Sequence, residues 1–437
     1  MGSKKTTSRK DKPSRKRSRA FTVIGIAVLA VIALTGIITL YTFLRPLRLV
    51  AVQSGEREIL AIRQAIAAYQ EKTGIRMEIV SQTGSTEAQP SGANILAASL
   101  DQPQTDILLF GAGKAAQSQS GRFRTLGTNA DGNFVPAYLA WCRSADGLYA
   151  LPLVADLAEL NVNEALLKQG GTVLPLPGNS LPQALARAAR TATIPGGFPV
   201  PGLVVALGDD HTLDTQLSAW ILASQGSRFY AALSKRISEN EDLEAALDLA
   251  LPSNAPGQSA SLRETLLAWD SFLADCGMDV SWFNAGISDL VAAVEGPVQP
   301  VAFLGSLSAH RRVSSQKLED YTGGQLPSLA VSPTAVVSPL TLVGVRAGSW
   351  REKDALAFVD FLADAGLQYE IDRASGLGPT MLATANVDLQ SRTVRELAMS
   401  HDFSANGLCP DSFSDARAAR NFLAEVRTWL KRNYRHP

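Results

Sequence analysis

An uncharged apolar segment near the N-terminus limits what this chain can fold into. Residues 21–44 read FTVIGIAVLAVIALTGIITLYTFL, and none of these 24 side chains is charged. A helix of this length spans roughly 36 Å, which is enough to cross a hydrocarbon layer of about 30 Å with some tilt. Because the segment has no polar face to turn toward water, we expect a transmembrane helix rather than a core helix.

The flanking residues indicate the orientation of this segment. Residues 1–20 hold nine Lys and Arg side chains and a single acid, Asp11. Basic flanks stay in the cytoplasm, so we expect residues 1–20 to form a cytoplasmic leader and residues 45–437 to lie on the extracytoplasmic, periplasmic side. A secretory signal would have a shorter apolar region and a small-residue cleavage site. The sequence therefore predicts an uncleaved, single-pass signal anchor in the cytoplasmic membrane, with a long signal peptide cleaved near Val50–Ala51 as the alternative.

The distribution of charge excludes one class of partner. The whole chain has 41 basic and 41 acidic side chains, so residues 21–437 keep 32 basic (41 less nine) and 40 acidic (41 less one). This acidic body argues against nucleic-acid binding, which needs a basic face toward the phosphates. A hydrophobic fraction of 46% in a chain longer than the roughly 100–200 residues of one domain predicts a globular body with at least two lobes.

Short apolar runs alternate with amphipathic stretches after Arg45, which is the pattern of an α/β protein. The first of these predict strands at residues 47–53, 75–80 and 105–110, with helices at 59–69 and 93–100 between them. This order predicts a parallel sheet. Farther along, the sequence predicts helices at 181–191, 217–224, 241–251, 262–275, 353–365, 367–374 and 415–432, and strands at 203–208, 300–304 and 341–345.

Small and polar residues follow the first three predicted strands. Ligands of parallel sheets bind outside the carboxyl ends of the strands, and Gly lets backbone N–H groups approach them. Ser54, Thr83, Gly84 and Gly111 are therefore candidate ligand contacts. The same residue types are also ordinary turn formers.

The sequence offers no positive case for an enzyme, a cofactor or a metal site. The four histidines are scattered singly, unlike metal ligands, and the Gly-x-Ser-x-Gly nucleophile motif is absent. Asp209-Asp210-His211 is the densest polar cluster, and we interpret it as a polar loop in which an Asp caps the following helix. His310 precedes Arg311-Arg312, which favours a solvated loop residue.

The three cysteines, Cys142, Cys276 and Cys409, are too few and too dispersed for a zinc site or a disulfide scaffold. Outside the cytoplasm one pair could be oxidised, with three possible pairings. Three buried thiols that act as small apolar side chains are the alternative.

The order of several segments resembles a known family, the extracellular solute-binding proteins of ATP-driven (ABC) importers. It is most similar to the two-lobed maltose/oligosaccharide-binding group, over about residues 47–385. Each motif is short, and their common order carries the resemblance. The segments are the opening strand-helix-strand block at 47–80, TDIL at 105–108, GLYALP at 147–152 with LNVN at 160–163, WILASQG at 220–226, the Trp-bearing helix at 267–277, WFNAG at 282–286, ALAFVDFL at 355–362 and SGLGPT at 375–380.

The chain also departs from that family. Gly305-Ser306-Leu307 stands where relatives often carry Gly-x-Trp, whose ring stacks on sugar, and Val162 stands where Tyr is common. Val337-Ser338-Pro339 replaces a Gly-Gly pair, and the apolar segment replaces the usual lipidated cysteine or cleaved leader. The missing stacking ring bears on the carbohydrate assignment rather than on the fold.

The resemblance implies an α/β, two-lobed fold of the periplasmic-binding-protein type II class behind the N-terminal transmembrane helix. The implied first lobe comprises residues 46–153 and 305–342, and the second comprises residues 154–304 and 343–437. The chain would cross between them near Val154–Asp156, Gly305–Ser308 and Thr341–Val345. A ligand would be clamped in the interlobe cleft by hinge closure.

The implied function is a membrane-tethered, monomeric solute-binding component that delivers a small polar solute, in first place a sugar or oligosaccharide, to ABC permease subunits. A non-transport sensor or envelope interaction module with a degenerate cleft is the alternative. Sugar recognition needs aromatic faces and carboxylate or amide acceptors. Trp220, Trp282 and Phe283 could instead be core residues. The expected ligand contacts are Ser54, Thr83, Gly84 and Gly111 on the first lobe, and Asp156, Trp220, Trp282 and Phe283 on the hinge and second lobe.

Overall fold

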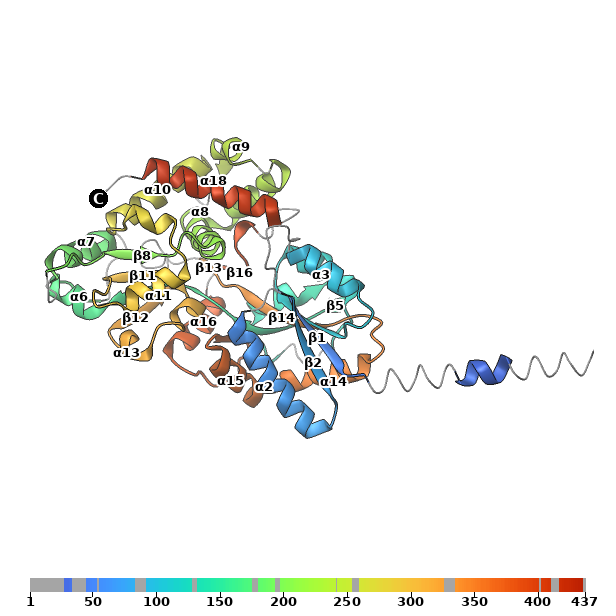
Figure 1. The fold of residues 1–437 in the computed structure, drawn as a ribbon. Helices are drawn as coiled ribbons and strands as arrows, with labels where there is room; N and C mark the ends of the chain where they lie inside the picture. The colour runs from blue at the N-terminus through green and yellow to red at the C-terminus, as the bar shows by residue number, and fades with distance from the viewer. Residues whose placement is uncertain are drawn as a thin grey trace, which may run out of the picture. The chain divides into compact units, whose positions relative to one another are not determined.

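A computed structural model gives the fold of the chain (Figure 1). It divides into two units, residues 1–46 and residues 47–437, which are considered separately. The residues that the structure describes are 27–33, 45–52, 55–82, 92–127, 132–174, 180–192, 197–240, 242–253, 259–325, 335–400, 402–409 and 416–434.

The first unit contributes one short helical stretch to the described residues. Residues 27–33 are helical, with exposed side chains, and lie within the predicted transmembrane segment at 21–44. The rest of that segment and the leader at 1–20 lie outside the described residues. Within the described part of the chain, no helix has the length and apolar character that crossing a membrane requires.

A six-stranded sheet organises the first lobe of the second unit, with the strand order β15-β6-β14-β3-β1-β2. The predicted parallel arrangement is confirmed, because β1 pairs in parallel with both β2 and β3. β14 comes from much later in the chain and lies antiparallel between β3 and β6. The bounds are β1 Leu47–Val52, β2 Met77–Gln82, β3 Ile107–Gly111, β6 Leu151–Ala155, β14 Leu340–Val345 and β15 Gly378–Pro379.

Helices bury their apolar faces on this sheet. In α2, Ile59, Ile62, Ile66 and Tyr69 recur at helical spacing, and all four are buried. α2 ends at Gly74, whose φ of 71° is left-handed and suits glycine. The helices of this lobe are α2 Glu56–Thr73, α3 Gly92–Asp101, α4 Lys114–Ser118, α5 Pro136–Leu139, α14 Glu352–Leu362, α15 Ala365–Ser375 and α16 Leu389–Ser400.

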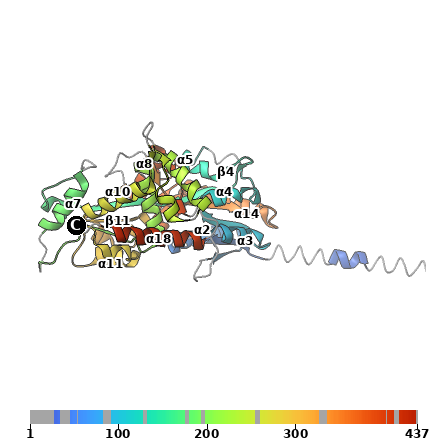
Figure 2. The ribbon, with the colours of Figure 1, turned by 90° about the horizontal axis from the view of Figure 1, so that it is seen from above.

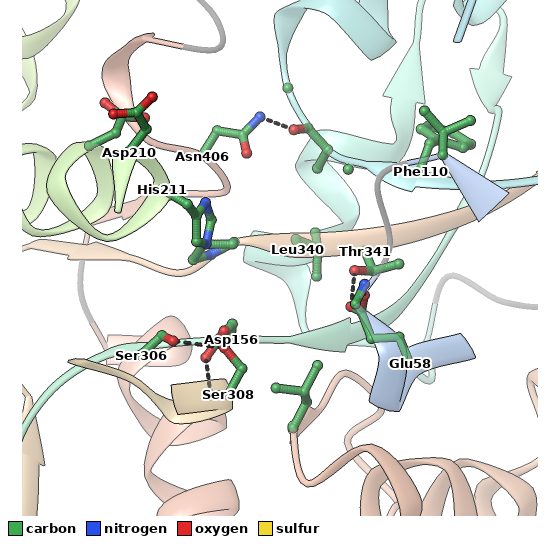
Figure 3. Close-up of a pocket in the computed structure, with 18 of the residues that line it drawn as sticks. Glu58, Phe110, Asp156, Asp210, His211, Ser306, Ser308, Leu340, Thr341 and Asn406 are labelled. Atoms are coloured by element: carbon green, nitrogen blue, oxygen red, sulfur yellow. Dashed lines mark hydrogen bonds between the residues drawn. The ribbon is translucent and has the colours of Figure 1, made fainter. Parts of the chain in front are cut away.

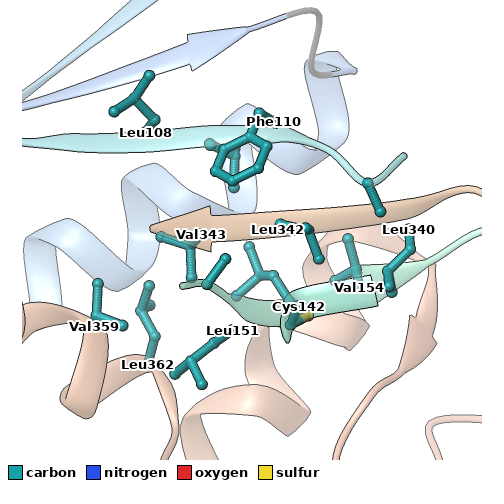
Figure 4. Packing of buried hydrophobic residues seen from close by; sticks show 14 of the residues in the cluster. Leu108, Phe110, Cys142, Leu151, Val154, Leu340, Leu342, Val343, Val359 and Leu362 are labelled. Atoms are coloured by element: carbon teal, nitrogen blue, oxygen red, sulfur yellow. The ribbon is translucent and has the colours of Figure 1, made fainter. Parts of the chain in front are cut away.

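The core of the first lobe lies between the sheet and these helices (Figure 4). Leu108, Leu342 and Val343 are fully buried strand residues, and Val359 and Leu362 reach them from α14. Burying one such aliphatic side chain contributes about 1.5–3 kcal/mol. The core therefore joins strands from both ends of the sequence.

A four-stranded sheet organises the second lobe, with the order β12-β7-β11-β8. β11 pairs antiparallel with β7 and parallel with β8, and β12 pairs antiparallel with the other side of β7. The bounds are β7 Ala158–Asn163, β8 Leu203–Val205, β11 Ala302–Ser306 and β12 Tyr321–Gln325. Short pairs elsewhere are β4 Arg143–Ser144 with β5 Gly147–Leu148, β9 Leu251–Pro252 with β10 Ser259–Ala260, and β13 Ala335–Val337 with β16 Asp402–Ser404.

Helices surround the second sheet, and α18 packs beside α8 and α10 (Figure 1, Figure 2). α7 and α10 have the predicted bounds, and α10 starts with a capping box between Ser261 and Glu264. α8 is interrupted at Gly226, whose φ is 83°. The helices are α6 Glu164–Gln169, α7 Leu181–Thr191, α8 Asp210–Asn240, α9 Leu243–Leu247, α10 Leu262–Asp275, α11 Ile287–Glu295, α12 Leu307–His310, α13 Ser315–Leu318 and α18 Ala416–Asn433.

The two lobes divide the chain differently from the predicted boundaries. β12 lies within residues 305–342, which were expected in the first lobe, yet it pairs with β7 in the second sheet. β14, α14 and α15 lie largely within residues 343–437, which were expected in the second lobe, yet they build the first core. The physical reason is that hydrogen-bonded strand partners, and not position along the chain, decide which sheet a strand joins.

The passages between the sheets shift accordingly. The first, Ala155–Ala158, lies where it was predicted, between β6 and β7. The second lies between β12 and β14, so Gly305–Ser308 is not a crossing and Thr341–Val345 is already a strand of the first sheet. After β16 the described chain returns to the second core at Leu408.

Candidate functional site

A cavity of about 1040 Å³ lies where the two lobes meet (Figure 3). Its first wall comes from the first lobe and includes Val52, Glu58, Gly111 and Thr341. Its second wall comes from the second lobe and the chain segments that join the lobes; the residues used below are Asp156, Asp209, Asp210, His211, Asp214, Ser306, Ser308, Arg312, Asn406 and Arg420. A ligand in this cavity would touch both lobes at once.

The first wall follows one edge of the six-stranded sheet. Val52 ends β1 and Gly111 ends β3, while the antiparallel β14 begins at this edge, with Thr341 opposite Gly111. The carboxyl ends of β1 and β3 therefore face the cavity, at the edge of the sheet where the sequence predicted ligand contacts.

Glu58 in the first turn of α2 brings a carboxylate to this wall. Its Oε1 accepts a hydrogen bond from the Thr341 hydroxyl at 2.6 Å, and its Oε2 accepts one from the Gly55 N–H at 2.6 Å. Burial raises the pKa of Glu58 above its usual value, although these two hydrogen bonds act in the opposite direction.

Asp156 brings a second carboxylate to the cavity from the first passage between the lobes. Its Oδ1 accepts hydrogen bonds from the N–H groups of Leu157 at 2.8 Å and Ser308 at 3.1 Å, and the residue is 8% exposed. Burial raises the pKa of Asp156, and the charge of nearby His211 partly opposes that rise. Asp156 therefore links the passage to the Ser306–Ser308 segment beside β11.

The second wall is built largely by the start of α8. Asp209 caps this helix as predicted, because its Oδ1 accepts from the N–H of Thr212 at 2.8 Å. Asp210 pairs with Arg427 of α18 at 2.6 Å, which ties α8 to the C-terminal helix. His211 follows and points into the cavity (Figure 3). The polar loop at 209–211 therefore both caps α8 and lines the cavity.

Asp214 anchors the segment that returns from β16. Its Oδ1 accepts from the Cys409 N–H at 3.0 Å and from the Ser218 hydroxyl at 3.4 Å. On the same segment, the Asn406 side chain donates to the carbonyl of Ala112 in the first lobe. Burial raises the pKa of Asp214. The segment at 406–409 therefore connects the two walls.

The carboxylates of Glu58, Asp156 and Asp214 have similar electrostatic surroundings. Their hydrogen-bond donors among the described residues are neutral, and burial raises the pKa of each while the charge of His211 partly opposes the rise. Arg57, Arg312 and Arg420 also line the cavity, but no ion pair in the described residues joins an arginine to these carboxylates. The cavity therefore offers a ligand both carboxyl acceptors and guanidinium donors.

Aromatic surface is scarce in the cavity. Among the described lining residues, Phe110 is the one aromatic side chain, and it is only 1% exposed. Its ring stacks on Phe123 with centroids 5.0 Å apart. The described lining thus offers hydrogen-bonding groups rather than an open ring face.

The predicted ligand contacts have different positions in the structure. Gly111 and Asp156 line the cavity, although whether they contact a ligand stays a prediction. Ser54, Thr83 and Gly84 lie outside the described residues.

The three predicted aromatic contacts do not line the cavity, which corrects their expected placement. Trp220 packs on Phe272 with ring centroids 5.1 Å apart and donates its Nε1–H to the Thr265 carbonyl at 3.3 Å. Phe283 is fully buried in the second core, and Trp282 is half-buried against the same core. The apolar helix faces that carry these rings turn to the protein interior.

Sequence reasoning missed Glu58, His211, Ser308 and Thr341 as lining residues. The cluster at 209–211 was visible as a polar loop, and its position after a strand was the available signal. Glu58 and Thr341 carried no such signal, because each looks like an ordinary helix or strand residue until the two are brought within 2.6 Å.

Two further expectations are settled by burial. His310 was expected to be solvated, but it is 2% exposed, with its Nδ1 2.9 Å from Glu159 Oε2 on β7. The three cysteines are free and buried, so they act as small apolar side chains. Within the described residues, no group of three or more His, Cys, Asp or Glu side chains could hold a metal ion.

Comparison with known proteins identifies the fold. No protein-family model matches the chain, and no curated protein matches its sequence. Solved structures do match. The bacterial solute receptor AcbH, described as having an exclusive preference for β-D-galactopyranose, is 15% identical with a TM-score of 0.63, over 89% of this chain and 98% of that one.

Two other bacterial receptors match over similar lengths. The putative binding protein MsmE of Bacillus subtilis, in an open conformation, is 13% identical with a TM-score of 0.62, over 90% of this chain and 97% of that one. The GacH receptor of Streptomyces glaucescens, solved unliganded and with acarbose, is 16% identical with a TM-score of 0.56, over 89% and 98%. The body of this chain therefore has the two-lobed α/β fold of the solute receptors of the maltose-binding type.

Proposed function

We propose that the protein is the solute-binding component of an ABC importer, which captures a small polar solute in the cavity between its lobes. The observation that carries this proposal is a cavity lined from both lobes, in a fold shared with solute receptors. A ligand that contacts both lobes favours the closed state, because those contacts exist only when the lobes are together. This role needs no catalytic residue and no cofactor.

A sugar or oligosaccharide is the first candidate solute. Glu58 and Asp156 accept hydrogen bonds, as sugar hydroxyl groups require, and Ser306, Ser308 and Asn406 add further polar groups. Arg57, Arg312 and Arg420 line the same cavity and add donors to these acceptors. A neutral solute with many hydroxyl groups can bond to both kinds of group, so we expect neutral sugars to bind.

We further propose that residues 21–44 tether this receptor to the cytoplasmic membrane, with residues 45–437 on the periplasmic side and permease subunits as partners. The uncharged segment behind a basic leader supports this topology, and a monomer is sufficient for the proposed role. In fractionated cells, the full chain should sediment with membranes, and a chain beginning at Arg45 should not. Equal partition of the two forms would contradict the tether.

A thermal-shift screen tests the binding function. Neutral sugars, polyols, amino sugars and sugar phosphates would be added in increasing concentration. A ligand that binds the folded state raises the melting temperature in a dose-dependent manner. At a ligand concentration of 100 times Kd, the free energy of unfolding increases by about 2.7 kcal/mol. If a folded protein shows no shift across the panel, transport of these solutes is not its function.

The contribution of Asp156 can then be measured with any solute found. Asp156→Asn keeps the size of the side chain but removes its charge, and we expect a loss of affinity of at least tenfold. Asp360→Asn, at an exposed position of the first lobe, is the matched control. Titration calorimetry should show an unchanged affinity for the control, and an unchanged affinity for Asp156→Asn would remove this residue from the site.

A second candidate function is a non-transport sensor or envelope module with a degenerate cleft. The lack of an exposed aromatic face in the described lining favours it. Such a module should fold normally yet remain silent in the same screen, which separates it from the receptor.

A further inference from the structure

Arg311 has its backbone in the second lobe. The preceding His310 bonds to Glu159 of β7 and packs edge-on to Phe303 of β11, with ring centroids 6.0 Å apart. Shortly after it, Val313 is buried in the cluster that contains Phe303 and Tyr321. Arg311 is therefore anchored to the second sheet through its neighbours His310 and Val313, one turn beyond Leu307, which packs in the first core.

The side chain of Arg311 reaches into the first lobe. Its Nε donates to the Gly376 carbonyl at 2.8 Å, and its Nη2 lies 2.6 Å from Asp388 Oδ2 and 3.4 Å from the Ser391 hydroxyl. These partners belong to the first lobe, because the adjacent Leu377 and the α16 residue Val394 are members of its core. One guanidinium thus bonds three separate groups across the lobe boundary.

Gly376 is shaped for this contact. It caps α15 with a φ of 74°, a left-handed conformation that suits glycine. A Cβ at this position would lie 2.8 Å from Cγ of Arg311, so the aliphatic part of the arginine occupies the space that a side chain would need. The SGLGPT segment at 375–380 thus provides both the space and the carbonyl group that Arg311 contacts.

A bond in the other direction reinforces the contact. The Arg57 guanidinium of α2 in the first lobe donates to the carbonyl of Arg311. Arg57 and Arg312 both line the cavity, as do Ser375 and Leu377 on either side of Gly376. The contact therefore lies directly beside the proposed ligand site.

We propose that Arg311 is an interlobe latch, a positioning residue that holds the two walls of the cavity together through Gly376 and Asp388. The Arg311 and Asp388 side chains are 16% and 32% exposed, so water screens this pair less than a fully exposed one. Loss of the latch shifts the lobes toward a more open arrangement, and a ligand that bridges both walls then binds more weakly.

The acid of the pair stays ionised over the physiological range. Burial alone would raise the pKa of Asp388, but the hydrogen bond from the Ser391 N–H and the charge of Arg311 outweigh it and leave this pKa below its usual value. The latch is therefore intact above about pH 4 and weakens only in acid.

The test measures the lobe arrangement without any ligand, so its outcome is independent of the proposed transport function. Spin labels at Glu71→Cys on α2 and Lys235→Cys on α8 report the interlobe distance by double electron–electron resonance; the native cysteines are buried. We expect Arg311→Gln to at least double the population at longer distances. A distribution identical to that of the parent protein would overturn the proposal.

The control is a similar ion pair within one lobe. Arg351 and Asp354 of the first lobe lie 2.6 Å apart with side chains 11% and 34% exposed. Arg351→Gln should leave the distance distribution unchanged, and an equal change in both variants would reduce Arg311 to a general structural role. Asp388→Asn should shift the distance distribution in the same direction but less than Arg311→Gln, because the bond from Arg311 to the Gly376 carbonyl remains. A distribution that is unchanged in both variants would contradict the latch.

Discussion

The two lobes build their walls of the cavity from different kinds of structure. The first wall is the edge of a sheet, where β1, β3 and β14 are held in register by backbone hydrogen bonds. The second wall consists of helix starts and connecting segments held by single side chains such as Asp209, Asp214 and Ser306. Side-chain bonds of this kind contribute about 1 kcal/mol each, so the second wall can change its shape and selectivity with fewer substitutions.

The largest predicted effect concerns the core of the second lobe, which supports the second wall of the cavity. Phe283→Ala should lower the free energy of unfolding by about 3–5 kcal/mol, because it removes a fully buried ring that packs on Tyr434 with centroids 5.2 Å apart. Urea unfolding followed by tryptophan fluorescence measures the change. Trp350→Ala, at a site 62% exposed in the first lobe, should cost less than about 0.5 kcal/mol. Equal effects would show that Phe283 is not a core residue.

Replacing a buried acid in the first lobe should stabilise the protein, whereas Phe283→Ala destabilises it. Asp372 of α15 is fully buried, and neither carboxylate oxygen has a hydrogen-bond partner among the described residues. Burial raises its pKa well above the usual value, so the folded state holds a proton that the unfolded state releases above about pH 4. The resulting penalty grows as the pH rises toward the folded pKa.

Asp372→Asn removes this penalty and should stabilise the protein by roughly 1–3 kcal/mol at pH 7. The advantage should vanish below about pH 4, where the acid is neutral in both states. Urea unfolding at both pH values, with exposed Asp360→Asn as the control, measures it. A gain that is the same at both pH values would rule out the titration as its cause.

The smallest expected effect concerns how helices begin in the two lobes. α10 starts with a capping box in which the Ser261 hydroxyl accepts from the Glu264 N–H at 3.2 Å, whereas α2 starts at Gly55 without a side-chain cap. Ser261→Ala should cost about 1 kcal/mol. Thermal unfolding measures it, and Ser271→Ala inside the same helix should stabilise slightly, by about 0.5 kcal/mol or less. Destabilisation by both changes would show that the cap is not the cause.

The sequence predicted best where structure is local. The alternation from Leu47 to Phe110 gave the parallel strands and their helices to within a few residues, and α7 and α10 have the predicted bounds. Periodicity and capping signals are contained within one element, so neighbours in sequence are sufficient to read them.

Lobe assignment and most of the cavity depend on contacts that no local pattern encodes. β14 resembles any apolar strand, and only its pairing with β3 and β6 places it in the first sheet. Glu58 and Thr341 are 283 residues apart, yet they share one hydrogen bond in the cavity. Trp220, Trp282 and Phe283 were expected at the site because aromatic faces bind sugars. They lie instead on apolar faces that pack in or against the second core.

The place of β14 has a consequence for synthesis of the chain. This strand lies in the middle of the first sheet but begins only at Leu340, after the whole second sheet has been made. Until it emerges, β3 and β6 have no common neighbour and leave unpaired backbone edges, which are prone to pair with other chains. The N-terminal lobe therefore cannot be finished first, and folding must wait for a nearly complete polypeptide, as expected for a protein with many long-range contacts.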